Sequence, residues 1–492
     1  MSLRQSFTSG VVWMSVGIWV EQAFNFIVFA ILARLLGVEA FGLLAMAAAF
    51  VLFSEFLVRE SISDILLTHE ELSPDRLNSV FWLLAVLGGV LTALLFLGAG
   101  PVAWFYGEAL AGDLLVGLSP TVMMIALTAV PVAILRREML FRVLALRAVV
   151  GAVIGGIVGI TMALSGYGVW ALVGQRLATT ATNIVMAWGA VSWRPAFSIS
   201  RDHIREVLKF GHRIIGLRAA ELAAVQSPAV IIGALMGPTQ AGFYAIAWRV
   251  VEITSFLLIT PFRTVAQPAF GAMAREGGEA SSLLIDLMRL TGFAAFPAFA
   301  GLAVLSEPIL VLLFGQKWIP AAPVLSLMSI FGMYLCIEKV QQTFCLAAGQ
   351  AGRLAALSWV EVLLATGAIA IASPYGLTVV TASFVAVFLI IWPLKFGNLA
   401  SIAEQSTLTL VQLHFVPLIL AVVMAVAVQG VVISLGGWPQ VVVLLLGTIT
   451  GVVIYVLLAF LFQRDRFHLL MLMIRPRAEP HEAGTTPNKI EG

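Results

Sequence analysis

Long apolar segments follow one another along almost the whole chain, separated by short polar connections. Within each segment the apolar residues are continuous and do not alternate with polar ones, as they would in the strands of a β-barrel. The length of each segment is close to the roughly 20 residues that a helix needs to cross a bilayer. Because backbone groups in lipid must bond within their own segment, we expect helices. The pattern predicts fourteen transmembrane helices, at about residues 11–36, 41–58, 79–99, 115–135, 145–164, 169–191, 214–235, 241–260, 284–305, 323–346, 354–372, 376–394, 414–434 and 440–462.

Two parts of the chain resemble each other at a fixed offset of 200 residues. Residues 31–47 read ILARLLGVEAFGLLAMA and residues 231–247 read IIGALMGPTQAGFYAIA. The identical positions are Ile31/Ile231, Leu35/Leu235, Gly37/Gly237, Gly42/Gly242, Ala45/Ala245 and Ala47/Ala247, and Glu21/Glu221 obey the same offset. Six spans separate the copies, so both enter the membrane from the same side and the repeat is parallel.

The expected fold is therefore an all-α polytopic membrane protein, with two six-helix lobes in a parallel repeat and two further helices. We divide it into an N-terminal lobe at 1–192, a cytoplasmic basic linker at 193–213, a C-terminal lobe at 214–400, transmembrane helices 13 and 14 at 401–462, and a cytoplasmic tail at 463–492. The linker fits a short amphipathic helix on the membrane surface and a solvated connection equally well. A polar connection is expected at 395–413.

Composition agrees with a membrane protein, since 61% of the 492 residues are hydrophobic and only 11% are charged. The connections on one side hold 21 of the 28 Lys and Arg residues, and those on the other side hold only Lys317. Those assigned to the first side include Arg59, Arg136, Arg147 and Lys395. The positive-inside rule then places both termini in the cytoplasm.

Sequence motifs for catalysis, metal binding or cofactor binding are absent, and no predicted loop is long enough for a catalytic domain. Cys336 and Cys345 lie nine residues apart on one predicted helix and therefore on opposite faces, which excludes a disulfide or a shared metal. We expect no enzyme activity, no metal, no cofactor and no nucleic-acid partner.

Polar residues inside the spans are the best candidates for a site, because a charge at mid-bilayer costs roughly 2.5–3.5 kcal/mol and should face the bundle interior. The candidate substrate-binding residues are Arg176, Arg218, Arg249, Lys339, Gln175 and Asn25. The candidate coupling or structural acids are Glu21, Glu221 and Glu252. Arginine suits an anionic substrate, and a carboxylate suits a coupling proton or sodium ion.

The same charges also have a structural interpretation. Arg218 with Glu221, and Arg249 with Glu252, are three residues apart on one helical face, so each pair fits a structural ion pair equally well. Arg176 has no acidic residue within one helical turn, which favours a functional role.

Several short segments carry a family resemblance, in the same order over about residues 5–400. They are ARLLGVEAFGLLA at 33–45, LRREMLFRVLALR at 135–147, LSGYGVWALVGQ at 164–175, EVLKFG at 206–211, GALMGPTQAGFYAI at 233–246, VLLFGQKW at 311–318 and AAGQAGR at 347–353. Together they resemble the polysaccharide transporter (Wzx-type oligosaccharide flippase) family of the multidrug/oligosaccharidyl-lipid/polysaccharide exporter superfamily.

The resemblance implies a bacterial inner-membrane flippase. It would carry undecaprenyl-pyrophosphate-linked oligosaccharide repeat units to the periplasmic leaflet by alternating access, for exopolysaccharide, capsule or O-antigen (lipopolysaccharide) synthesis. In the related lipid II flippases, cavity arginines meet the pyrophosphate and helices 13 and 14 help guide the lipid tail. The implied partners are the lipid-linked oligosaccharide, membrane lipid, a coupling proton or sodium ion, and a polysaccharide polymerase with its chain-length regulator.

Two other functions compete with this one. An ion-coupled multidrug antiporter of the same superfamily is expected to have a cavity that is more acidic than basic. A membrane polysaccharide polymerase or ligase needs a large outer loop with basic residues, and the single outer Lys317 disfavours it.

Overall fold

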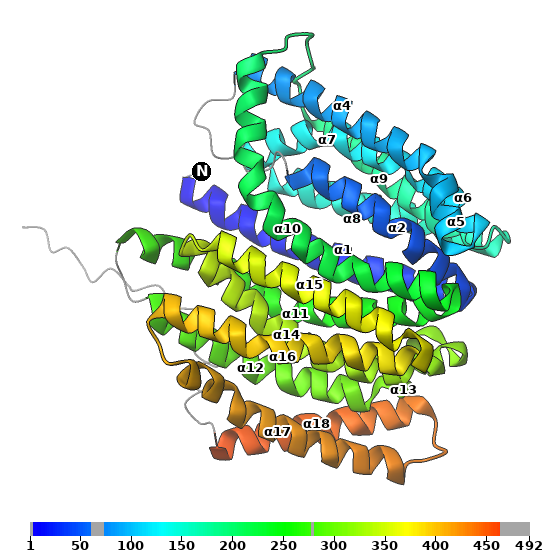
Figure 1. Ribbon diagram of the computed structural model, residues 1–492, viewed down its shortest axis with the longest axis vertical. Helices are drawn as coiled ribbons and strands as arrows, with labels where there is room; N and C mark the ends of the chain where they lie inside the picture. Colours follow the sequence, from blue (N-terminus) through cyan, green and yellow to red (C-terminus); the bar gives the residue numbers. More distant parts are fainter. Residues whose placement is uncertain (1–2, 61–72, 277–279, 463–492) are drawn as a thin grey trace, which may run out of the picture.

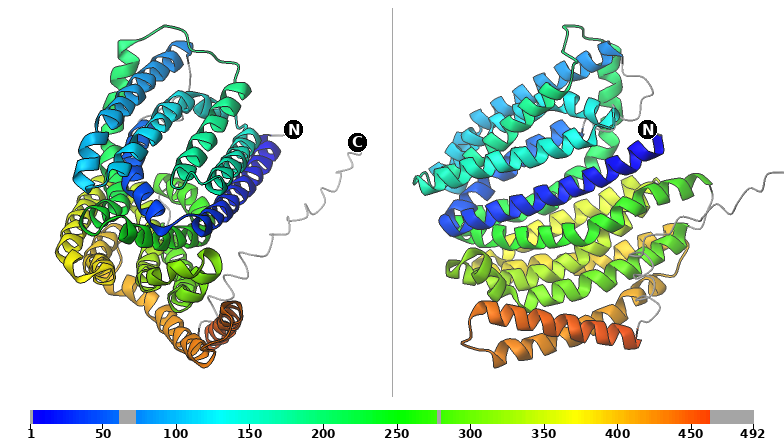
Figure 2. Two further views of the ribbon diagram at one scale, coloured as in Figure 1. Left: turned by 90° about the vertical axis from the view of Figure 1, so that its right-hand side faces the viewer. Right: turned by 180° about the vertical axis from the view of Figure 1, so that it is seen from behind.

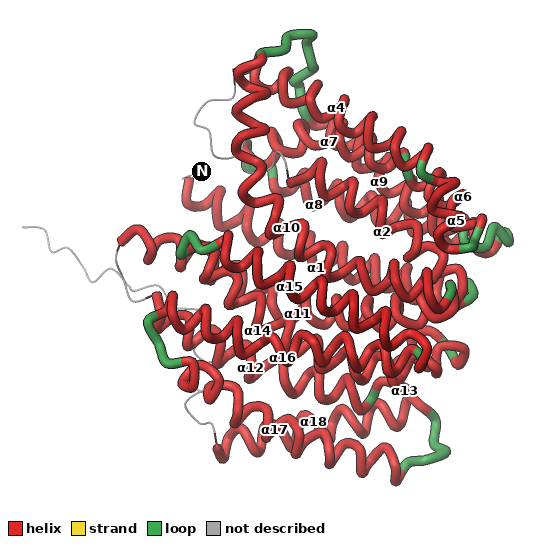
Figure 3. The backbone as a smooth tube through the Cα atoms, viewed as in Figure 1, coloured by secondary structure: helices red, strands yellow, loops and turns green. Residues whose placement is uncertain are grey.

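The computed structural model describes residues 3–60, 73–276 and 280–462, and within these ranges it contains helices and no strand (Figures 1 and 3). Thirteen stretches of the described chain are helical, long and apolar enough to cross a membrane. The predicted span at 169–191 is a helix as well, and its apolar character is interrupted by polar side chains. The predicted all-α membrane fold with about fourteen spans is confirmed.

The described part of the first lobe contains six long helices and two short ones. They are α1 (Leu3–Leu35), α2 (Val38–Glu60), α4 (Pro74–Leu97), α5 (Ala99–Tyr106), α6 (Ala109–Leu118), α7 (Pro120–Arg137), α8 (Phe141–Leu164) and α9 (Trp170–Ala190). The second lobe follows the same order, with α10 (Arg201–Met236), α11 (Pro238–Glu276), α12 (Ala280–Val304), α13 (Ser306–Phe314), α14 (Ala322–Ala347), α15 (Ala351–Ala372) and α16 (Leu377–Ala403). The last two helices are α17 (Thr407–Ser434) and α18 (Gln440–Phe462).

The lobes lie side by side, and α2 forms much of their interface by packing on α10 and α11. Helices α17 and α18 lie beyond the second lobe, where α17 packs on α12 and α18 packs on α13 (Figure 2). We call the end of the bundle where α1 begins the proximal end, and the end where α1 finishes the distal end. Helix α18 finishes at the proximal end (Figure 1).

Two predicted connections are partly helical. The linker at 193–213 is extended only up to residue 200, and its remainder belongs to α10, which changes direction before it runs along α2 (Figure 1). The extended part is held on α4, since Asn78 Nδ2 donates to Ser198 Oγ at 3.2 Å and Asn78 Oδ1 accepts from Ala196 N at 3.1 Å.

The predicted polar connection at 395–413 is wrong, because α16 continues to Ala403 and α17 begins at Thr407. Lys395 was assigned to that connection, yet it is buried inside α16, with 4% of its surface exposed. Its ammonium group forms ion pairs with Glu338 and Glu361, and these compensate for the burial of the charge. A lysine therefore does not mark a helix end here.

The repeated glycines of the two lobes meet at the distal end. A Cβ on Gly42 would lie 1.7 Å from the carbonyl oxygen of Pro238, and a Cβ on Gly242 would lie 2.3 Å from that of Val38. The two contacts are equivalent under the offset of 200 residues, because Gly42 corresponds to Gly242 and Val38 corresponds to Pro238. The repeat in the sequence is therefore a repeat in space, and glycine is required because no side chain fits between the two backbones.

Charged side chains join the lobes at the same end. Lys317 Nζ donates to the carbonyl oxygens of Arg34, at 2.9 Å, and of Leu36, where α1 finishes. In return, Arg34 donates from Nε to Leu313 O, at 2.9 Å, and from Nη2 to Leu312 O, where α13 finishes. Each cation thus bonds to the C-terminal end of a helix in the opposite lobe, where the backbone carbonyls lack helical partners. We call Arg34, Lys317 and these carbonyls the distal clasp.

Candidate functional site

A polar cavity of about 850 Å³ lies inside the bundle. All but two of its lining residues belong to helices of the first lobe; the exceptions are Arg218 on α10 and Arg249 on α11. The cavity reaches from Phe29 on α1 and Leu44 on α2 to Arg59 and Arg136, which lie near the proximal ends of α2 and α7. The cavity therefore extends to the proximal ends of these helices, and the distal clasp lies at the opposite end of α1.

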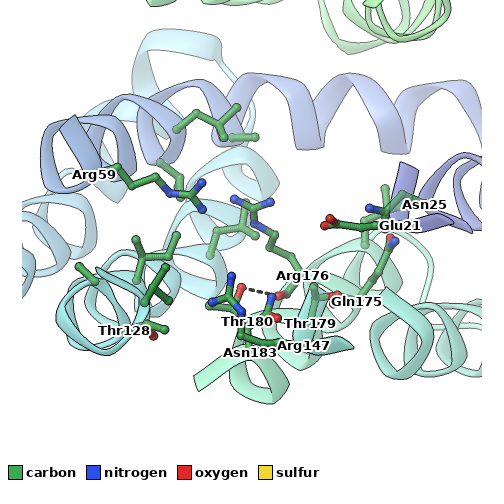
Figure 4. Close-up of a pocket in the computed structure, with 18 of the residues that line it drawn as sticks. Glu21, Asn25, Arg59, Thr128, Arg147, Gln175, Arg176, Thr179, Thr180 and Asn183 are labelled. Atoms are coloured by element: carbon green, nitrogen blue, oxygen red, sulfur yellow. Dashed lines mark hydrogen bonds between the residues drawn. The ribbon is translucent and has the colours of Figure 1, made fainter. Parts of the chain in front are cut away.

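Arginine is the dominant charged residue of this cavity. Six arginines line it, whereas Glu21 is the one acidic residue among the described lining residues. The six are Arg59, Arg136, Arg147, Arg176, Arg218 and Arg249. Figure 4 shows Arg59, Arg147 and Arg176 around a common space, with Glu21 and Asn25 at one side of it. Guanidinium groups from several helices around one space are suited to bind a phosphate or pyrophosphate by bidentate hydrogen bonds.

Helix α9 supplies a polar stripe to the cavity wall. Gln175, Arg176, Thr179, Thr180 and Asn183 all line the cavity, and they recur at the three- and four-residue spacing of one helical face. The hydroxyl groups of Thr179 and Thr180 donate to the backbone carbonyls of Gln175 and Arg176, each at 2.9 Å. These bonds satisfy the hydroxyls within the helix and leave the longer side chains to face the cavity.

Arg176 is held by a buried carboxylate of another helix. Its Nη2 donates to Glu55 Oε2 at 2.6 Å, and the two side chains are 42% and 4% exposed. Thr121 Oγ1 lies 3.1 Å from the other carboxylate oxygen of Glu55, so α2, α7 and α9 meet at this carboxylate. The pairing crosses 121 residues of sequence, which is why no acidic residue near Arg176 in the chain revealed it.

Some of the other predicted candidates line the cavity and the rest do not. Asn25, Gln175 and Glu21 line it, as do Arg218 and Arg249. The remaining candidates, Glu221, Glu252 and Lys339, are not among its lining residues.

These three instead pair with one another or with the two cavity arginines. Arg218 Nη1 lies 3.0 Å from Glu221 Oε2, and Arg249 Nη1 lies 2.7 Å from Glu252 Oε2. Lys339 Nζ lies 3.5 Å from the other oxygen of Glu221. Arg218 and Arg249 therefore fit both the structural and the substrate-binding interpretation, since each forms an intrahelical ion pair and also lines the cavity.

Sequence reasoning missed three of the six arginines. Arg59, Arg136 and Arg147 were assigned to cytoplasmic connections, because each lies at the border of an apolar stretch. In the structure each lies within a helix, since α2 and α7 continue past the apolar stretch and α8 begins before it. The three- and four-residue spacing of the polar residues on α9 was the available signal for the missed Thr179, Thr180 and Asn183.

A second buried cluster lies in the C-terminal lobe, outside the cavity lining. Lys395 Nζ pairs with Glu338 Oε1 at 2.6 Å and with Glu361, and it donates to the Tyr334 hydroxyl at 3.0 Å. Tyr334 in turn donates to Glu361 Oε1 at 2.9 Å. Glu338 and Lys339, which are adjacent in sequence, thus join different ion pairs, one with Lys395 and one with Glu221.

Within the described chain, no group of three or more His, Cys, Asp or Glu residues could hold a metal ion. Cys336 and Cys345 are both buried and not joined in a disulfide, as predicted for small core residues.

Comparison with known proteins matches residues 31–323 to a family model described as "Polysaccharide biosynthesis protein". The succinoglycan biosynthesis transport protein ExoT of Rhizobium meliloti (strain 1021) is 26% identical over 462 residues, which cover 93% of this chain and 94% of that protein. The lipopolysaccharide biosynthesis protein WzxC of Escherichia coli (strain K12) is 24% identical over 348 residues, or 68% of each chain.

Two solved structures share the fold. The lipid II flippase MurJ in an inward closed conformation has a TM-score of 0.72 at 16% identity, over 93% of this chain and all of that one. An inward-facing multidrug resistance MATE family transporter of the MOP superfamily has a TM-score of 0.57 at 16% identity, over 81% and 99% of the two chains. The expected resemblance is confirmed by the family match: the chain belongs to the polysaccharide biosynthesis protein family.

Proposed function

We propose that the protein is a flippase for lipid-linked oligosaccharides in the bacterial inner membrane. It moves undecaprenyl-pyrophosphate-linked repeat units from the cytoplasmic to the periplasmic leaflet, for exopolysaccharide, capsule or O-antigen synthesis. The observation that carries this proposal is the cavity with six arginines, which suits a pyrophosphate inside an otherwise apolar bundle. The names of the relatives, a succinoglycan transport protein and a lipopolysaccharide biosynthesis protein, support the same substrate class.

The proposed mechanism is alternating access between the lobes. In this state the cavity extends to the proximal end, while the distal clasp and the glycine contacts hold the other end closed. We assign the proximal end to the cytoplasm, because the basic connections lie there and positive residues favour that side. The head group enters among the arginines, the distal end then opens, and the prenyl tail stays in lipid.

The charge of the cavity disfavours a multidrug antiporter as the alternative. Such a transporter with cationic substrates needs an acidic cavity, whereas the described residues that line this one include six arginines and one glutamate. We also propose that the protein is not an enzyme, since the polar residues that surround the cavity suit anion binding and hold no group arranged for bond cleavage.

Substitution of Arg176 tests whether the cavity binds an anion. Arg176→Ala alone leaves Glu55 buried without its partner, so the informative variant is Arg176→Ala with Glu55→Gln, which removes both charges. We expect the double variant to reach the membrane at normal level and to lose polymer export, and we expect Arg176→Lys to restore export only in part. Normal export by the double variant at matched expression would remove Arg176 from the site.

Glu21 is the proposed coupling acid, with a proton or a sodium ion as the coupling ion. It lines the cavity together with Asn25, whereas its repeat partner Glu221 pairs with Arg218 and Lys339, so the two acids differ in role. Glu21→Gln should keep the protein level and lose the dependence of transport on the pH gradient. Transport with unchanged pH dependence would exclude Glu21 as the acid that couples protons.

A further inference from the structure

Glu221 on α10 lies between two cations of the second lobe. Arg218 Nη1 donates to Glu221 Oε2 at 3.0 Å, and Lys339 Nζ donates to Glu221 Oε1 at 3.5 Å. The two oxygens of one carboxylate thus have different cationic partners, one on α10 itself and one on α14. Of these three residues, Arg218 alone is among the residues that line the cavity.

The two contacts of Glu221 are unequal. The contact with Arg218 has the length of an ordinary hydrogen bond, whereas the contact with Lys339 is longer than the usual 2.7–3.2 Å or so. Lys339 Nζ also donates to Gln342 Oε1 at 3.2 Å, and that partner is neutral. Because the four-carbon stem of a lysine is flexible, Lys339 can move closer to Glu221 by side-chain rotation, without a shift of α14.

An anion in the cavity competes with Glu221 for the guanidinium of Arg218. The side chain of Glu221 is only 19% exposed, so little water is at hand to replace a lost arginine. A carboxylate in such a place is costly unless another cation pairs with it. Lys339 already touches the second oxygen of Glu221, and it lies outside the cavity lining, where a bound anion does not draw it away.

We propose that Lys339 is a positioning residue, which holds the Glu221 carboxylate when Arg218 turns to an anion. The hydrogen bond from Arg218 to Glu221 is exchanged for one from Arg218 to a phosphate oxygen, and Lys339 Nζ moves closer to Glu221. The inference rests on the proposed function, because it takes the cavity to be an anion site. It gives Lys339 a role in substrate binding that acts through Glu221 and not by contact with the substrate.

Two other cavity arginines have acidic partners that differ from this carboxylate. The second oxygen of Glu55, the partner of Arg176, accepts from the neutral hydroxyl of Thr121 at 3.1 Å. The side chain of Glu252, the partner of Arg249, is 46% exposed, so water can solvate it when Arg249 turns away. A lysine that takes over the acid is therefore needed at Arg218 and not at Arg249.

Calorimetric titration of the purified full-length protein in lipid nanodiscs, with inorganic pyrophosphate as the probe, tests this. The proteins compared are the wild type, Lys339→Met, Glu221→Gln and the double variant. We expect Lys339→Met to weaken pyrophosphate binding roughly tenfold, the order of magnitude of coupling between charges in one network. In the Glu221→Gln background the same change should have little effect, because the neutral glutamine needs no cation. Glu221→Gln alone should bind at least as tightly as the wild type.

Two controls separate this role from others. Lys339→Arg keeps the positive charge and should retain most of the affinity. In a Glu252→Gln background, Lys339→Met should cause the same loss as in the wild type, because Glu252 is paired with Arg249 and not with Lys339.

The dependence on background decides the outcome. A direct or long-range attraction between Lys339 and the anion would cause equal losses with and without Glu221, and equal losses overturn this inference alone. Weaker binding by Glu221→Gln would show that Glu221 orients Arg218 for the anion, and it also contradicts the inference. Absence of pyrophosphate binding by the wild type overturns the anion site and this inference with it.

The double variant keeps the test valid if Lys339→Met does not fold. It removes both charges of the pair and so leaves no carboxylate without its cation. Its affinity for pyrophosphate should equal that of Glu221→Gln, and a tenfold loss between these two proteins would overturn the inference.

Discussion

At the scale of single residues, the two members of an ion pair need not be equally important for stability. The side chain of Arg176 is 42% exposed and faces the cavity, whereas that of Glu55 is 4% exposed. Loss of Glu55 leaves an arginine that water can solvate, but loss of Arg176 leaves a buried charge.

We therefore expect Arg176→Ala to lower the free energy of unfolding by roughly 3–5 kcal/mol and Glu55→Gln to lower it much less. Adding Glu55→Gln to Arg176→Ala should recover most of the loss. Thermal unfolding of the three variants in detergent measures this, and equal losses in both single variants would contradict the asymmetry.

The glycines of the distal contact allow a second prediction at this scale. Gly42→Ala places a Cβ against the Pro238 carbonyl, and such overpacking costs typically about 1–3 kcal/mol unless the lobes move apart. Gly37→Ala is the matched control, because no atom lies within 4 Å of its added Cβ. Melting temperature and polymer export should fall for Gly42→Ala and stay near wild type for Gly37→Ala.

At the scale of helices, the distal clasp joins α1 to α13 through backbone carbonyls. Hydrogen bonds from a charged donor are worth about 1.5–3 kcal/mol each, and Lys317 makes two of them. Lys317→Met should therefore shift the protein towards the state in which the distal end is open.

A cysteine at position 36 measures this shift, because Leu36 is 5% exposed at the contact. Added maleimide should label it faster in Lys317→Met than in the parent with Lys317. Glu307→Gln, an exposed change in the first turn of α13, should leave the rate unchanged. Equally slow labelling of Lys317→Met and of the parent would show that the distal clasp does not hold the distal end closed.

Helices were also the level at which the sequence was most informative. Apolar length located the spans and the 200-residue offset located the lobes, because burial in lipid needs long apolar stretches. Helix ends were harder to place, so Arg59 and Arg147 were assigned to connections although they face the cavity. Glu55 and Lys395 were missed because their partners lie far away in sequence, and only the packing of helices brings these charges together.

At the scale of the whole molecule, the orientation in the membrane is the first point to test. Thr239 lies exposed at the distal end and Ile199 lies exposed in the linker, so single cysteines at these positions report on opposite sides. A reagent that does not cross the membrane should label Thr239→Cys and not Ile199→Cys in whole cells. The buried Cys336 and Cys345 should give little background. Labelling of Ile199→Cys alone would reverse the proposed orientation.

The uneven construction of the cavity has an electrical consequence. Four of its arginines belong to the first lobe and two to the second, so an anion keeps most of its contacts when the lobes move apart. Separation of the lobes therefore does not by itself release the bound anion. A pyrophosphate with about two negative charges gains about 5 kcal/mol of electrical work when it crosses a membrane held at 100 mV, negative inside. On the proposed function, the voltage across the membrane supplies the energy that frees the head group, and flipping should slow in cells whose membrane potential has been collapsed.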